Sequence, residues 1–110
     1  MIAKVVVCAA LGALLAAGCG GKEPTSGAAI SAARYALRKA EEDGAAQAAP
    51  VVMRAAHEKL DDATALRDDK QDEPARRLAE EVTIEAQLAD AMARNARVKK
   101  RLANIEEGGS

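Results

Sequence analysis

Large apolar side chains are scarce in this chain, and that scarcity limits what it can fold into. Leu, Ile and Val together make up 13 of the 92 residues from 19 to 110. That share is below the fifth that often separates folded from disordered chains. However, Ala, Arg, Glu, Lys and Gln dominate this region, and they are strong helix formers. The sequence therefore predicts long helices that pack closely on alanine faces around a thin core.

Two helices are expected in the first half of this region, over residues 28–43 and 50–69. Ser26 is placed to cap the first helix and Gly44 to end it. Pro50 suits the first turn of the second helix, where its missing N–H costs nothing, and residues 45–49 form a turn or a frayed connection. Apolar residues recur at helical spacing on one face of each helix: Ile30, Ala33, Leu37 and Ala40 in the first, and Met53, Ala56, Leu60 and Ala63 in the second.

A third, longer helix is expected over residues 74–106, after a polar connection in which Asp72 is a candidate cap. Helices of about 33 and 20 residues span about 50 and 30 Å, so the third must overhang the second. We expect an all-α fold: a small antiparallel three-helix arrangement, made of a helical hairpin and a shorter first helix, with a long overhanging third helix. The front half of the third helix carries an apolar face, which consists of Ala75, Leu78, Val82, Ala86 and Ala89.

The back half of the third helix carries a second apolar pattern that resembles a coiled-coil seam. Its residues alternate at spacings of three and four, as the a and d positions of a heptad do. Asn95 falls at an a position, where it either fixes the register against a partner helix or faces water. The seam is a candidate surface for self-association or for an envelope protein partner, and it consists of Leu88, Ala91, Asn95, Val98, Leu102 and Ile105.

Basic residues gather near the end of the same helix. One interpretation is the favourable placement of cations at a helix C-terminus. The other is contact with phosphates or an anionic polymer. The candidate contacts for the second interpretation are Arg94, Arg97, Lys100 and Arg101.

The composition argues against several classes of function. Without Lys4, the chain has 15 basic and 17 acidic residues, so it lacks the basic surface that nucleic acid requires. His57 is the only histidine, and we expect it to be an exposed bystander, with no metal site, no cofactor and no catalytic constellation. Tyr35 is the only aromatic residue and lies off the apolar stripe. We expect the protein not to be an enzyme.

The N-terminus reads as a secretory signal peptide. Lys4 precedes an apolar run over residues 5–15, and small residues follow it up to Cys19. The run is shorter than the roughly 20 apolar residues that a membrane-spanning helix needs. Cys8 would leave with the signal, so Cys19 would have no partner for a disulfide.

The segment Leu15-Ala16-Ala17-Gly18-Cys19 resembles the lipobox of bacterial lipoproteins. That resemblance implies cleavage between Gly18 and Cys19, lipid attachment to the Cys19 thiol and acylation of its amino group, with palmitate a typical acyl group. Several acyl chains anchor a protein stably. Gly20, rather than Asp, follows the cysteine, which implies export to the outer membrane, facing the periplasm.

These features divide the chain into four parts. Residues 1–18 are the lipoprotein signal peptide, and residues 19–27 are the lipidated cysteine and a flexible tether. Residues 28–107 are the alanine-rich helical domain, and residues 108–110 are a disordered tail.

The helical region also resembles a family of alanine-rich bacterial lipoprotein domains of unknown function, often found beside an OmpA-like peptidoglycan-binding domain. Ala48 stands where that family often has an aromatic residue. The resemblance implies an interaction or scaffold role in the cell envelope. The matching residues are Ala40, Gly44-Ala45, Ala49-Pro50, Ala55, Lys59-Leu60, Ala63, Ala75-Arg76, Leu78-Ala79-Glu80-Glu81, Ala86 and Leu88-Ala89.

Overall fold

The computed structural model describes residues 25–108, and this part of the chain contains four helices and no strand. The expected all-α class is confirmed, but there are four helices here where three were expected. In chain order they are α2 (Ser26–Glu42), α3 (Ala45–Ala48), α4 (Pro50–Asp68) and α5 (Asp72–Gly108).

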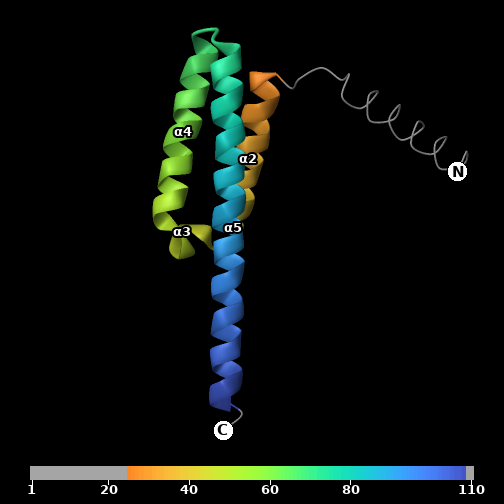
Figure 1. The fold of residues 1–110 in the computed structure, drawn as a ribbon, viewed down its shortest axis with the longest axis vertical. Coiled ribbons are helices and arrows are strands. Elements are labelled where there is room, and N and C mark those ends of the chain that lie inside the picture. Colours follow the sequence, from red (N-terminus) through yellow and green to blue (C-terminus); the bar gives the residue numbers. More distant parts are fainter. Residues whose placement is uncertain (1–24, 109–110) are drawn as a thin grey trace, which may run out of the picture.

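The three long helices lie side by side, as Figure 1 shows, with α5 packed against both α2 and α4. α2 and α5 run in the same direction along the molecule, and α4 runs in the opposite direction. α5 continues well beyond the ends of the other two. The start of α2 and the far end of α5 therefore lie at opposite ends of the described structure.

A buried serine joins the starts of α2 and α5. Ser26 is only 1% exposed, and both its N–H and its hydroxyl donate to Oδ1 of Asp72. This contact holds the pKa of Asp72 below its ordinary value, first through the hydroxyl and then through the backbone N–H. α2 thus begins two residues before the expected position, and the cap is Thr25, whose Oγ1 accepts from the N–H of Ala28 at 3.1 Å, rather than Ser26.

The connection between α2 and α4 is more ordered than the sequence suggested. Gly44 has a φ of 90°, a left-handed conformation that glycine adopts without the usual steric cost. The chain then forms α3, a single helical turn, where a turn or frayed connection was expected. Pro50 is the first residue of α4, as predicted.

Alanine supplies most of the core. Of the apolar stripes predicted for the first two helices, every residue is buried, and so is the front face of α5 apart from Leu78, which is half-buried. Because an alanine side chain is a single methyl group, the helix backbones approach closely at these positions. The alanines with no exposed surface at all are Ala33, Ala40, Ala45, Ala56, Ala63, Ala75, Ala79, Ala86 and Ala89.

Enlarging one of these alanines should force the helices apart. We expect Ala79→Leu to destabilise the fold by about 1–3 kcal/mol, the usual cost of inserting methylenes into a packed core. Ala103→Leu is the matched control, because Ala103 lies on the same helix and is exposed. Urea denaturation followed by circular dichroism measures both variants. Equal stability of the two would show that the alanine face tolerates larger side chains.

Candidate functional site

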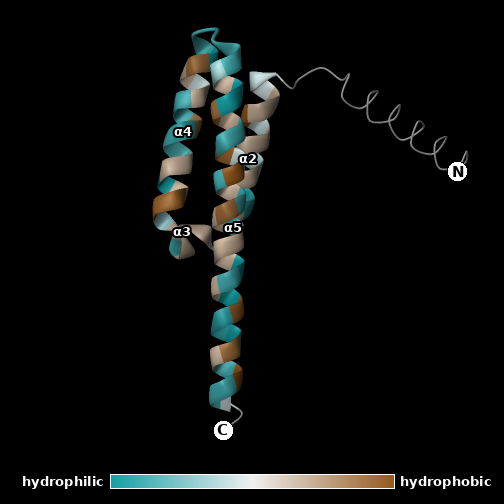
Figure 2. Cartoon of the chain, in the orientation of Figure 1, coloured by the Kyte–Doolittle hydropathy of each residue, from teal (hydrophilic) through white to brown (hydrophobic). Residues whose placement is uncertain are grey.

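The end of α5 extends past the rest of the fold. The last buried residue of the helix is Ala93, at 4% exposure, and every residue from 94 to 108 is exposed. We call residues 94–108 the overhang. In Figure 2 apolar patches recur along it between hydrophilic ones, so the overhang is not uniformly polar.

The predicted seam lies on the outward side of α5. At 3.6 residues per turn its residues fall about half a turn from the buried alanines of the same helix. Leu88, Val98 and Leu102 are 53%, 53% and 54% exposed, and Ile105 is 68% exposed. The seam is therefore uncovered in the single chain, along the three-helix part as well as along the overhang.

Two residues missing from the predicted seam belong to the same face. Ile84 and Met92 are 65% and 40% exposed and lie within a quarter turn of the seam's centre line. Asn95 is also exposed, so within the single chain it faces solvent. We define the outer seam as Ile84, Leu88, Ala91, Met92, Asn95, Val98, Leu102 and Ile105.

Two residues of the predicted basic cluster bond to other residues of the fold, and the other two face solvent. Arg94 donates to Oδ2 of Asp90 at 2.5 Å, and Arg97 donates to the backbone carbonyl of Asp43 at 2.7 Å. Lys100 and Arg101 are exposed and form no ion pair with any residue in 25–108. Half of the cluster therefore stabilises the base of the overhang, and the other half faces solvent.

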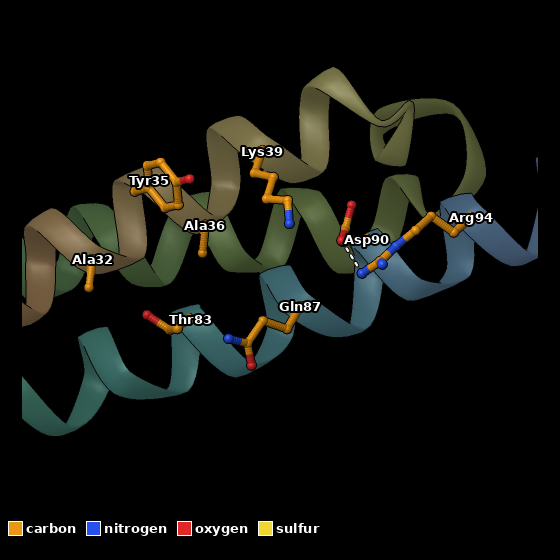
Figure 3. Close-up of a pocket in the computed structure, with 8 residues that line it drawn as sticks. All are labelled: Ala32, Tyr35, Ala36, Lys39, Thr83, Gln87, Asp90 and Arg94. Carbon is orange, nitrogen blue, oxygen red and sulfur yellow. Dashed lines mark hydrogen bonds and ion pairs between the residues drawn. The ribbon is translucent and has the colours of Figure 1, made fainter.

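A groove of about 640 Å³ runs between α2 and α5 and ends at Arg94 (Figure 3). Asp90 is 5% exposed, and its Oδ1 is buried without an N–H or O–H donor from the described residues. Lys39 reaches from α2 toward the same end of the groove. The residues that line the groove are Ala32, Tyr35, Ala36, Lys39, Thr83, Gln87, Asp90 and Arg94.

The carboxyl of Asp43 interacts with Asp90 at the base of the overhang. The side chain of Asp90 lowers the pKa of Asp43 most, and the charges of Arg97 and Lys39 add to that shift. Oδ1 of Asp43 lies 3.6 Å from the Arg97 guanidinium. The C-terminal end of α2 is thus joined to α5 just where the overhang begins.

On the other side of α5, Lys59 of α4 connects the two helices. Its ammonium pairs with Glu85 and lies 4.0 Å from Oε2 of Glu81. The hydrogen bond with Glu85 raises the pKa of Lys59, and the charges of Glu85 and Glu81 add to it. Two carboxylates therefore share one ammonium at this edge of the outer seam.

The two other residues that the sequence singled out, Tyr35 and His57, lie on the surface. Tyr35 is 66% exposed, and His57 is exposed, with its Nε2 at hydrogen-bond distance, 2.7 Å, from Oε1 of Glu41, a contact between α4 and α2. Within residues 25–108, no three His, Cys, Asp or Glu side chains gather as a metal site, and no helix is both long and apolar enough to cross a membrane. Gly18 and Cys19 lie outside the described residues.

Residues 28–105 match the family model DUF4398, a domain of unknown function. The chain belongs to this family. No curated protein and no solved structure matches it significantly. The DUF4398 domain thus extends almost to the end of α5 and includes most of the overhang.

The contact between α2 and the base of the overhang should make the DUF4398 domain sensitive to acid. Because the pKa of Asp43 is lowered on folding, its carboxylate stabilises the fold at neutral pH, and this contribution is lost as pH falls through the lowered value. We expect Asp43→Asn to be less stable than the wild type at pH 7, with the difference shrinking as the pH falls below about 4 and vanishing only below the lowered pKa of Asp43. Thermal unfolding at several pH values measures it. Glu42→Gln, which removes an exposed carboxylate at the same helix end, is the matched control.

Proposed function

We propose that the protein is a lipid-anchored interaction or scaffold module of the bacterial outer membrane. In this proposal Cys19 carries the lipid, the helical domain faces the periplasm, and the outer seam of α5 binds the helix of a partner. Its role is binding rather than catalysis. The antiparallel helical hairpin with its first helix serves as the rigid support for an overhanging third helix.

The observation that carries this proposal is the position of the outer seam. The larger apolar residues of the back half of α5 all lie on the side away from the core and keep about half or more of their surface exposed, apart from Met92. An isolated helix as short as the overhang is marginal in water. A partner along the seam would bury these side chains and stabilise the overhang at once.

Binding of an anionic envelope polymer such as peptidoglycan is the second candidate. Arg94 and Arg97 are already paired with Asp90 and Asp43. Only Lys100 and Arg101 of the predicted contacts remain for this role. Exposed single charges contribute little each, so the apolar seam is the better-supported surface.

The anchor is tested by removing the thiol. Cys19→Ser should abolish incorporation of radiolabelled palmitate and leave an uncleaved precursor, because the lipid has no other attachment point in the lipobox. Cys8→Ser is the matched control and should be labelled and processed like the wild type, since Cys8 lies within the predicted signal peptide. Normal outer-membrane partitioning of the Cys19→Ser protein would refute the lipoprotein part of the proposal.

The seam is tested with a charge. Leu102→Asp should release the protein from any complex that it forms in membranes solubilised in mild detergent, because docking would bury the new carboxylate. Helical content should stay unchanged, since Leu102 is 54% exposed in the single chain. Asn104→Asp adds the same charge to the opposite side of the overhang and should sediment like the wild type. Equal sedimentation of both variants would exclude the seam as a docking surface.

A further inference from the structure

We propose that the outer seam is occupied by α5 of a second copy of this chain, packed antiparallel. This inference rests on the proposed partner-binding role of the seam and names the partner. The seam lies on the side of α5 away from the buried alanines, so a second α5 can approach without displacing α2 or α4. The overhang of each copy then covers the outer face of the other copy's three-helix part.

In an antiparallel pair of helices, residues at heptad position a lie opposite residues at heptad position d. If Ala93 of both copies marks the centre, Ile84 lies opposite Leu102 of the second copy, and Leu88 lies opposite Val98. Asn95 then lies opposite Ala91, the smallest residue of the seam, which leaves room for its amide beside the twofold axis. Every large residue from Ile84 to Leu102 obtains an apolar counterpart in this register.

The charges beside the seam complement each other in the same register. On one edge, Lys99 of the second copy approaches Glu85, and Glu81 is nearby. Among residues 25–108, these two carboxylates share only Lys59, and Lys99 forms no ion pair. On the other edge, Gln87 lies opposite Arg101 of the second copy. Arg94 meets its own counterpart at the axis, where each is already paired with its own Asp90.

Two other alignments bring like charges together. A parallel pair would set Glu80 beside Glu85 and Arg94 beside Lys99. An antiparallel pair shifted by one heptad toward the C-terminus would set Glu85 beside Glu106 and Arg94 beside Arg101. Like charges directly across an interface are costly and act against such partners. The antiparallel register centred on Ala93 brings no carboxylates together, and in its one axial contact between like charges each Arg94 is already paired with its own Asp90.

A second copy fits this seam better than an unrelated helix for a further reason. The seam has an exposed half on the three-helix part, from Ile84 to Met92, and an exposed half on the overhang, from Asn95 to Ile105. An antiparallel copy supplies the apolar counterparts of the large residues from Ile84 to Leu102 from the same sequence, while Ile105 lies at the edge, opposite Glu81. The interface is isologous and closes after two chains, as twofold interfaces do.

Disulfide trapping tests the register. In the full chain with Cys8→Ser and Cys19→Ser, purified in detergent, a mixture of the Ile84→Cys and Leu102→Cys proteins should form a mixed disulfide on mild oxidation. Neither protein alone should cross-link, because in this register each position is about 27 Å from its counterpart, too far to bridge. A mixture of Ile84→Cys and Asn104→Cys is the off-seam control. Disulfides formed by each single variant with itself would overturn the antiparallel arrangement.

Sedimentation equilibrium of the same purified protein tests the partner's identity. We expect a monomer–dimer equilibrium, which Leu102→Asp weakens tenfold or more and Asn104→Asp leaves unchanged. Lys99→Glu should weaken it by about three- to tenfold, the effect of two exposed ion pairs turned repulsive. A monomer at every concentration would overturn this inference. The proposed function would then be tested separately. It would be supported if Leu102→Asp releases a different partner from solubilised membranes, and contradicted if it does not.

Discussion

The close approach of α5 to α2 and α4 is the constraint on which the rest of this structure depends. It is made by alanines with no exposed surface, on all three long helices. A methyl group buries little area, so this core gains less from the hydrophobic effect than one built from leucine. Polar contacts at its edges join both helices to α5: Ser26 of α2 bonds to Asp72, and Lys59 of α4 pairs with Glu85.

An alanine core also changes where the larger side chains lie. In a helix bundle the large apolar residues are expected inside, yet α5 buries its alanines and Val82 and exposes Ile84, Leu88 and Met92. The larger side chains of the core come instead from α2 and α4, as Ile30, Leu37, Met53 and Leu60. The outer seam and the thin core are therefore two consequences of one packing arrangement, since the same helix presents small residues inward and large ones outward.

The sequence predicted the helix positions well, because Pro50, Gly44 and the spacing of apolar residues are local signals. The sequence predicted both apolar patterns of α5. It did not predict which of them faces the core, since neither pattern alone shows which side of the helix lies inward. The front pattern ends at Ala89 and the back pattern begins at Leu88, and the structure places them on opposite sides of the helix. The Ser26–Asp72 contact could not be predicted either, because the residues are 46 positions apart and each alone resembles a helix cap.

At the base of the overhang, the inward face of α5 changes from apolar to polar. Up to Ala93 the inward face is apolar apart from Asp90, and from there the same face continues with Arg97 and Lys100. Arg97 donates to the carbonyl of Asp43 at the end of α2, and so closes the core with a charged contact. Beyond that point the inward face is polar and only the outer seam remains apolar. The apolar face of the overhang points away from the core of its own chain. Such a face can be buried only by association with another molecule, and this is the physical argument for a binding role of the overhang.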